Sequence, residues 1–297
     1  MNEHAPDSSA PIAFTKMNGL GNDFVIIDTR ERAHNHALQL TSENIQKIAN
    51  RETGIGCDQF ITLEPADDAD IFMRIRNADG SEVDACGNAT RCVAWLIFDQ
   101  TAKANPVIET NAGYLGTLVK DQTSVTVDMG VPKFDWQDIP LSEQFHDTRG
   151  IELQVGPIDN PVMHTPSVVN VGNPHCIFWV DDLDAHDLGA IGPILENHPL
   201  FPERANITLA KVDSPEHITI RVWERGAGLT RACGTAACAT AVCAARKRLT
   251  GRKLTILLPG GPLEIDWQGD DHIHMTGPTE LEYRGQIDPR TWTAITV

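Results

Sequence analysis

The sequence carries the same short motif twice, and each copy holds a cysteine whose thiol could serve as an acid or a base. Cys86 lies in DACGN and Cys233 in RACGT, 147 residues apart (233 − 86 = 147), and each precedes a glycine and a small polar residue. In both copies a polar turn gives way to a helical pattern, which places the thiol beside the backbone N–H groups of a helix start. Such a position favours the thiolate, a competent base near neutral pH.

Two equivalent cysteines suit the inversion of a carbon centre. Equivalent residues of a duplicated domain pair can converge on one cleft, where a thiolate removes a proton from one face and a thiol returns one to the other. The sequence shows no lysine-centred pyridoxal phosphate site, so we expect no cofactor. Cys233, Cys238 and Cys243 recur every five residues, which scatters them around a helix, and there is no CxxC pair, so we expect no metal site.

The duplication extends well beyond the cysteines. IFMRIRN, ending at Asn77, matches ITIRVWE, ending at Glu224, and Gln59 matches Asn206, both at a shift of 147; Gly21-Asn22 matches Gly172-Asn173 at 151. A repeat of this length predicts two similar domains with the substrate cleft between them. We expect a flexible tail at 1–11, an N-terminal domain at 12–135, a connecting segment at 136–164 and a C-terminal domain at 165–297.

Each half shows an α+β pattern. Short β-branched runs bounded by turn residues, such as FVIID, SVTVDM, CIFWVDD and LTILLP, predict strands. The clearest helical patterns follow the cysteines: GNATRCVAWLIFD, and GTAACATAVCAARKRL, which Gly251 ends. The second is rich in alanine and cysteine on every side, which is typical of a helix enclosed by strands. We therefore predict two pseudo-symmetric domains, each a curved, mostly antiparallel sheet or barrel around a central helix.

Composition limits the partners. The 297 residues include 41 acidic and 24 basic side chains, a formal charge of −17 that argues against nucleic acid or anionic membrane. Without an export signal or a long apolar run, we expect a cytoplasmic protein whose seven cysteines are reduced. Five of them are expected to be small buried hydrophobic residues: Cys57, Cys92, Cys176, Cys238 and Cys243.

With these residues assembled, the sequence closely resembles the diaminopimelate epimerase family, isomerases that interconvert LL- and meso-diaminopimelate on the route to lysine and peptidoglycan. The resemblance runs from about Phe14 to the C-terminus, through KMNGLGNDFVIID, GIGCDQ, RNADGSEVDACGN, VGNPH, FPERANI, and ERGAG followed by ACGTAAC, in family order. The departures are the N-terminal tail, Ala89 and Thr90 after the first cysteine, and Leu229. They affect the fine shape of the cleft, not the reaction.

The resemblance implies a cofactor-independent enzyme, commonly a homodimer, in which Cys86 and Cys233 form the acid–base pair and His175 and Glu224 tune the two thiols. It implies a substrate site made of Asn22, Gln59, Asn77, Gly87, Asn88, Asn173, Asn206, Glu224, Arg225, Gly234 and Thr235. The residue types agree with a substrate that has an amino-acid group at each end, because Arg225 suits a distal carboxylate and Glu224 an ammonium. The amides could donate hydrogen bonds to the intermediate.

Other readings remain open at this point. A proline or hydroxyproline racemase would also use two domains and two cysteines, although a one-ended substrate has no use for Arg225. A redox protein could join Cys86 to Cys233 as a reversible disulfide, and a thiol-competition assay would separate that reading from an epimerase. A cysteine hydrolase would need a histidine aligned with one thiol and would leave the other unused. A binding module without activity is the last alternative.

Overall fold

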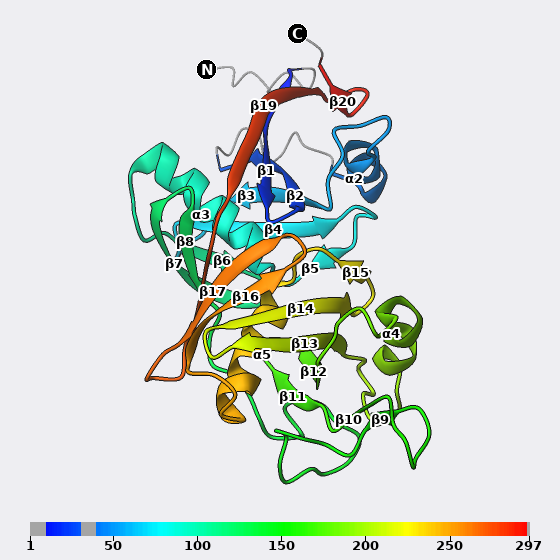
Figure 1. Ribbon diagram of the computed structural model, residues 1–297. Helices are drawn as coiled ribbons and strands as arrows, with labels where there is room; N and C mark the ends of the chain where they lie inside the picture. The colour runs from blue at the N-terminus through cyan, green and yellow to red at the C-terminus, as the bar shows by residue number, and fades with distance from the viewer. Residues whose placement is uncertain (1–9, 31–39, 296–297) are drawn as a thin grey trace. The chain divides into compact units, whose positions relative to one another are not determined.

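The computed structural model describes residues 10–30 and 40–295 and divides the chain into two compact units (Figure 1). The first unit holds residues 1–127 and 278–297, and the second holds 128–277. Most of the predicted tail, residues 1–9, lies outside the described residues.

In the first unit a hairpin leads into a mixed sheet. Strands β2 and β3 pair in parallel, as do β4 and β6, and the other neighbouring strands are antiparallel. In chain order the elements are β1 (Ile12–Gly19), β2 (Asn22–Asp28), α2 (Ser42–Ala49), β3 (Gln59–Glu64), β4 (Ile71–Asn77), β5 (Glu82–Val83), α3 (Gly87–Thr101), β6 (Val107–Thr110), β7 (Gly113–Asp121) and β8 (Ser124–Asp128), whose last residue begins the second unit.

The second unit opens with the two-stranded sheet of β9 (Gln154–Val155) and β10 (Met163–His164) and then repeats the order of the first. Its strands β12 and β13, and β14 and β16, are the parallel pairs. The elements are β11 (Ser167–Asn170), β12 (Pro174–Trp179), α4 (Leu188–Glu196), β13 (Asn206–Ser214), β14 (His217–Glu224), β15 (Gly228–Thr230), α5 (Gly234–Arg246), β16 (Lys253–Leu258), β17 (Gly261–Trp267) and β18 (Ile273–Gly277).

The two units therefore share one topology, and their registers agree. Ile75 pairs with Val83 in the first unit and Val222 with Thr230 in the second, and both partners are shifted by 147 (222 − 75 and 230 − 83). The predicted duplication is confirmed at the level of individual strand pairs.

The helix that follows each cysteine is the centre of its unit, as predicted. Helix α3 contacts β1, β6 and β7, and α5 contacts β11, β12, β13, β16, β17 and β18. Every residue of α5 from Ala236 to Ala244 is buried. The reason is compositional: alanine, cysteine, threonine and valine leave α5 without a charged face until Arg246, so strands can cover it on all sides.

The predicted domain bounds need two corrections. The segment 136–164 is not a peripheral connection, because Ile139, Leu141 and Ile151 pack into the same core as Phe178 of β12. These apolar residues are too scattered to show a strand or helix period, which is why the sequence pattern did not reveal their burial.

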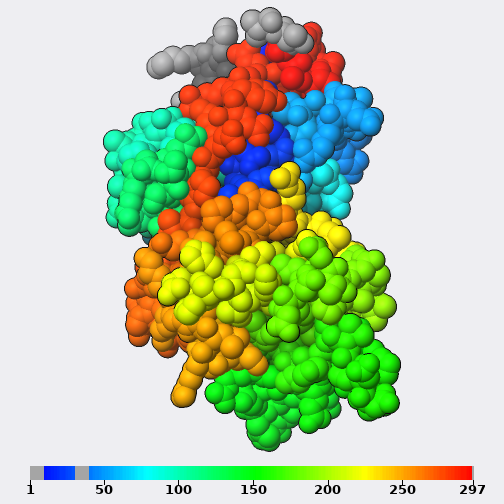
Figure 2. All heavy atoms as spheres, viewed as in Figure 1, coloured from blue at the N-terminus to red at the C-terminus, as the bar shows by residue number. Residues whose placement is uncertain are grey.

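The C-terminal end belongs to the first unit. Strand β19 (Glu280–Asp288) pairs antiparallel with β1, and β20 (Thr293–Ala294) pairs with β19. In Figure 2 the atoms of β19, in red, lie beside those of β1, in blue. The long exposed edge of β1 is thus covered, which is how native sheets avoid an unpaired edge. No helix of ranges 10–30 and 40–295 has the length and apolarity to span a membrane.

Candidate functional site

Both cysteines occupy the N-cap position of the central helix of their unit. Cys86 precedes α3 with φ −147° and ψ 111°, and Cys233 precedes α5 with φ −132° and ψ 104°. Their carbonyl oxygens accept the first helical hydrogen bonds, from Thr90 N at 2.9 Å and Ala237 N at 3.1 Å. Gly87 and Gly234 then begin the helices without a side chain, which allows a ligand to approach the backbone N–H groups of the first turn.

In the first unit, the thiol of Cys86 lies against predicted amides. Cys86 Sγ lies 3.8 Å from Asn22 Oδ1, and the same oxygen accepts a hydrogen bond from Asn88 Nδ2 at 3.4 Å. Asn22 begins β2 and Asn88 lies in the first turn of α3, so the strand end and the helix start meet at the thiol. The structure thus brings together three of the predicted residues.

Two further predicted amides form a second pair in this unit. Gln59, the first residue of β3, faces Asn77, the last residue of β4, and Gln59 Nε2 donates to Asn77 Oδ1 at 3.3 Å. Asn77 Nδ2 donates to Ser81 Oγ at 3.1 Å. Gln59 Oε1 is buried and has no hydrogen-bond partner within the described residues, which leaves an acceptor for a ligand.

An ionic network that the sequence did not predict supports Asn22. Asp58 Oδ2 accepts hydrogen bonds from Asn22 Nδ2 at 3.1 Å and from the backbone N–H of Asp23 at 3.0 Å, while Arg51 Nη2 bridges Asp58 at 2.7 Å and Asp23 at 2.8 Å. The buried ammonium of Lys16 lies 2.6 Å from Asp23. Burial raises the pKa of Asp23, but Arg51 and Lys16 outweigh it and hold that pKa well below its ordinary value. Asp58 lies within GIGCDQ, one of the motifs that carry the family resemblance, but the sequence alone indicates no role for this aspartate.

In the second unit, Cys233 is 5% exposed and lies beside an acid. Burial first, and then the negative charge of Glu224, raise the pKa of the Cys233 thiol well above its ordinary value. The hydroxyl of Thr235, 3.5 Å from the sulfur, and the backbone N–H of Ala236 act in the opposite direction. The expected lowering of the pKa at a helix start is therefore not found for Cys233, because desolvation and a neighbouring carboxylate outweigh it. The role of Glu224 in tuning this thiol during catalysis stays a prediction.

The loop after Glu224 is held by backbone contacts. Asn206 Oδ1 accepts from the backbone N–H of Arg225 at 3.0 Å, and Asn206 Nδ2 donates to the Pro174 carbonyl at 3.0 Å. Arg225 Nη1 donates to the Glu203 carbonyl at 2.9 Å. The predicted Asn206 thus places Arg225 and β12 relative to each other within the unit.

A residue that the sequence did not single out holds the next position of this loop. The buried carboxylate of Glu196, at the end of α4, accepts from Gly226 N at 3.0 Å, Trp223 Nε1 at 2.7 Å and Arg204 Nη1 at 3.1 Å. These contacts lie on both sides of Arg225. Glu196 therefore fixes the turn that presents the Arg225 side chain.

His175 is fully buried on β12, and its ring lies 2.7 Å from Asn173 Oδ1 through Nε2. Burial, and then the positive charge of Arg225, lower the pKa of His175 to about 3, so the ring is neutral at physiological pH. Nε2 then carries the proton and donates to Asn173. Within the described part of the chain the ring contacts this amide and no thiol, so the tuning of a thiol by His175 stays a prediction.

The buried histidine makes stability depend on pH. Its pKa is about 6.5 unfolded and about 3 folded, so the unfolded state takes up the proton first and stability falls as the pH drops from 6.5 towards 3. Between pH 7 and about pH 5 the loss from this group is about 2 kcal/mol, at about 1.4 kcal/mol per pKa unit. Urea unfolding at both pH values should show that His175→Gln loses less stability than the wild type. Equal losses would contradict a neutral His175.

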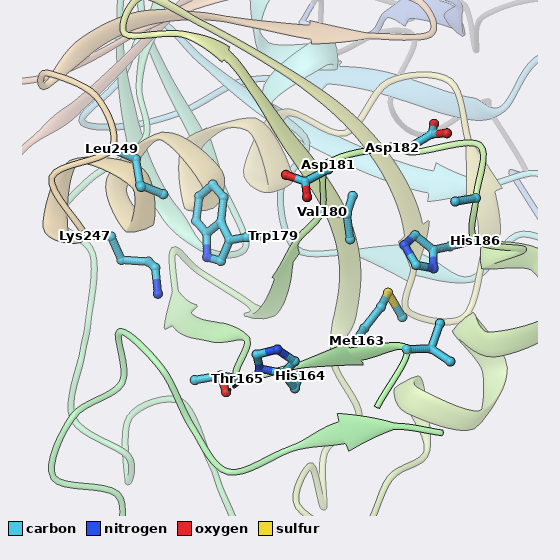
Figure 3. A pocket seen from close by; sticks show the side chains of 12 residues that line it. Met163, His164, Thr165, Trp179, Val180, Asp181, Asp182, His186, Lys247 and Leu249 are labelled. Atoms are coloured by element: carbon cyan, nitrogen blue, oxygen red, sulfur yellow. Dashed lines mark hydrogen bonds between the residues drawn. The ribbon is translucent and has the colours of Figure 1, made fainter. Parts of the chain in front are cut away.

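A cavity in the second unit lies at the other end of α5 from Cys233 (Figure 3). Its lining includes Trp179, Asp181 and Lys247, and Lys247 is the C-cap of α5. The structure describes every residue of the predicted substrate site, and none of them lines this cavity. The candidate chemistry therefore does not lie in this cavity. In the described ranges, no cluster of three or more His, Cys, Asp or Glu is arranged to hold a metal ion.

The two units supply the same reactive group in different surroundings. Each unit presents a thiol at a helix start, next to uncharged hydrogen-bonding groups. One difference between the units lies beside the thiol of the second: Asn77 in the first unit corresponds to Glu224 in the second (224 − 77 = 147). Within the second unit, the carboxylate of Glu224 favours the protonated form of Cys233.

Comparison with known proteins identifies close relatives. The family described as "Diaminopimelate epimerase" matches residues 14–134 and 167–282. A diaminopimelate epimerase of Rhodopseudomonas palustris (strain HaA2) is 55% identical over 280 residues, which cover 93% of each chain. One from Nitrobacter hamburgensis is 53% identical, covering 95% of this chain and 97% of the relative, and one from Brucella anthropi is 52% identical, covering 94% and 92%.

Solved structures of more distant proteins share the fold. A PhzF-family phenazine biosynthesis protein of Bacillus anthracis superposes with a TM-score of 0.65 at 18% identity, covering 94% of this chain and 99% of that one. A hydroxyproline epimerase of Agrobacterium vitis gives 0.63 at 14% identity, covering 99% and 94%. These likenesses confirm the predicted fold class.

Proposed function

Because the chain belongs to the diaminopimelate epimerase family, we propose that it interconverts LL- and meso-diaminopimelate without a cofactor, using Cys86 and Cys233 as its acid–base pair. The observation that carries the proposal is the equivalent placement of the two thiols, each at the N-cap of its unit's central helix. One thiolate removes the α-proton, and the other cysteine donates a proton to the opposite face of the same carbon.

We assign the acid and base roles in the forward direction from the surroundings of the two thiols. The raised pKa of Cys233 keeps that thiol protonated, so it serves as the acid, and Cys86 serves as the base. In the reverse direction the roles exchange. The backbone N–H groups that follow Gly87 and Gly234 bind the carboxylate of the reacting end, where negative charge develops.

The remaining predicted residues bind the rest of the substrate. Glu224 accepts hydrogen bonds from an ammonium, and Arg225 binds the distal carboxylate with its guanidinium. The uncharged side chains orient the substrate without protonating the intermediate: Asn22, Gln59, Asn77, Asn88, Asn173, Asn206 and Thr235. His175 acts by fixing the amide of Asn173.

A proline or hydroxyproline racemase is the runner-up, and the relatives do not favour it. The solved hydroxyproline epimerase is only 14% identical to this chain, against 52–55% for the three diaminopimelate epimerases. The three relatives compared above are named diaminopimelate epimerases, which does not favour a redox role for the two cysteines.

The test is a direct conversion assay on the purified chain with LL-diaminopimelate, in the presence of a chelator and without pyridoxal phosphate. Chiral chromatography should show meso-diaminopimelate approaching equilibrium, and no turnover of L-proline or hydroxyproline under the same conditions. Conversion that appears only after pyridoxal phosphate is added, or that is faster with proline, would refute the proposal.

We also propose that the enzyme is a cytoplasmic homodimer that binds neither nucleic acid nor membrane. The formal charge of −17 supports the second part, because it repels polyanionic partners. Light scattering should give about twice the 32.5 kDa chain mass. A mass equal to the single chain would reject the dimer.

A further inference from the structure

We infer that Asp58 is a positioning residue for Cys86 and acts through the amide of Asn22. The link is two hydrogen bonds long, from Asp58 to Asn22 Nδ2 and from Asn22 Oδ1 to the thiol. The inference rests on the proposed function where it concerns turnover, but its effect on the thiol can be measured without turnover.

The chemistry of Asp58 decides which end of the amide faces the sulfur. An ionised carboxylate only accepts hydrogen bonds, so the group that Asn22 turns towards Asp58 must be its NH₂. Asn22 Nδ2 lies 3.1 Å from Asp58 Oδ2, and Oδ1 is consequently turned to Cys86 Sγ at 3.8 Å and to Asn88 Nδ2 at 3.4 Å. The orientation follows from donor and acceptor matching.

Asp58 is itself held on several sides. Its backbone N–H donates to Asp23 Oδ1 at 2.9 Å, and its carboxylate accepts from Asp23 N and from Arg51 Nη2. Lys16, 4% exposed, fixes Asp23 from the other side. The Asp58 side chain is 43% exposed, so it is not a core group, and a replacement there need not disrupt packing.

The duplicated unit shows that this device is specific to the first half. Position 58 corresponds to Ala205 (58 + 147 = 205), so the second unit has no equivalent carboxylate. There the matching amide, Asn173, is fixed by His175, which stands where the first unit has Phe24 (24 + 151 = 175). The side-chain oxygen of Asn173 accepts a hydrogen bond from His175, whereas the side-chain oxygen of Asn22 faces the Cys86 thiol. Unrelated side chains thus hold the two equivalent amides by different ends: Asp58 binds the NH₂ group of Asn22, and His175 binds the oxygen of Asn173.

The orientation matters for reactivity. An amide oxygen beside the sulfur accepts a hydrogen bond from the S–H group and orients the thiol form of Cys86, which is the form that donates a proton in the reverse direction. An amide N–H in the same place would donate to the sulfur and favour the thiolate. Without Asp58, the Asn22 amide can turn over. We expect Cys86 to become more nucleophilic and, at the same time, less well aimed at the substrate carbon.

The experiment compares Asp58→Ala and Asp58→Asn with the wild type. Rate constants for alkylation of Cys86 and Cys233 by iodoacetamide at about pH 7.5 are obtained by peptide mass mapping, and kcat and KM are measured with diaminopimelate. Asp58→Ala should raise the Cys86 rate about fivefold or more without changing Cys233, because alkylation follows the thiolate fraction. It should lower kcat about tenfold, as expected for a misplaced catalytic group.

Asp58→Asn is the conservative rescue. Its remaining carbonyl oxygen can still accept from both Asn22 Nδ2 and Asp23 N, and Arg51 keeps its contacts with Asp23. Both readouts should stay within about threefold of the wild type. If asparagine proved as damaging as alanine, the negative charge and not the acceptor would be responsible, and the inference would be wrong.

Asp28→Ala provides a matched control. Asp28 is the last residue of β2, the strand that Asn22 begins. Like Asp58, it accepts from a backbone N–H and an arginine, here both of Arg30, but these contacts join it to no predicted site residue. It should change neither readout. If Asp58→Ala does not fold, Arg51→Gln removes one support of Asp58 and should shift Cys86 alkylation in the same direction by a smaller factor. Parallel changes at both cysteines, or none, would reduce Asp58 to a structural role, whether or not the chain turns over diaminopimelate.

Discussion

Replacing Cys86 or Cys233 with alanine is expected to lower kcat for diaminopimelate by about 10³-fold or more, because positioned proton transfer contributes about 10²–10⁴-fold and no other group replaces it. Each variant loses a different half of the reaction, so either one alone should abolish efficient inversion. Initial rates of meso-diaminopimelate formation, measured by chiral chromatography, give the effect.

The central helices supply matched controls for these variants. Cys92 lies on α3 with Cys86, and Cys243 lies on α5 with Cys233, and both are buried in the cores. Cys92 is 0% exposed and Cys243 is 1% exposed, so neither thiol is open to a substrate. Cys92→Ala and Cys243→Ala should keep kcat within about threefold of the wild type. Near-normal turnover in Cys86→Ala or Cys233→Ala would remove that cysteine from the mechanism.

Arg225→Lys is expected to raise KM for diaminopimelate by about 10–100-fold and to leave the fold intact. Lysine keeps the charge but cannot form two parallel hydrogen bonds with a carboxylate. A charge-assisted hydrogen bond contributes about 1.5–3 kcal/mol, and each 1.4 kcal/mol is a factor of about ten in affinity. Steady-state kinetics over a wide substrate range separates KM from kcat.

Arg221→Lys on β14, the strand that ends directly before Arg225, is the control. Arg221 forms an exposed ion pair with Asp184, which contributes little, and it is not among the predicted substrate ligands. Its KM should remain at the wild-type value. If Arg225→Lys behaved in the same way, the distal carboxylate would be bound by another group.

The sequence predicted the parts of the site that depend on local pattern. The duplicated ACG motif, followed by an apolar helix pattern, places Cys86 and Cys233 at helix starts, and the structure has both as N-caps. The repeat pairs Gln59 with Asn206, and the structure has them at equivalent places, as the first residues of β3 and β13. Motifs of this kind encode backbone geometry within a few residues, so they are readable without a structure.

Features that depend on contacts between distant parts of the chain could not be predicted from local sequence patterns. The pairing of β19 with β1 joins residues about 270 positions apart in register, such as Ile12 and Ile287, and no local pattern records it. The pKa of Cys233 depends on complete burial and on Glu224, which the local helix-start argument omits. The orientation of Asn22 depends on Asp58, 36 residues away.

The measurement that tests the account most directly follows the α-proton. The reaction is run in heavy water from pure LL-diaminopimelate, and substrate and product are analysed by mass spectrometry at low conversion. With Cys86 and Cys233 acting from opposite faces, the proton removed and the proton delivered are different, so early meso product carries solvent deuterium at the inverted carbon while recovered substrate remains unlabelled. Early product that keeps mostly its original hydrogen, or substrate labelled as fast as product, would contradict a two-cysteine mechanism.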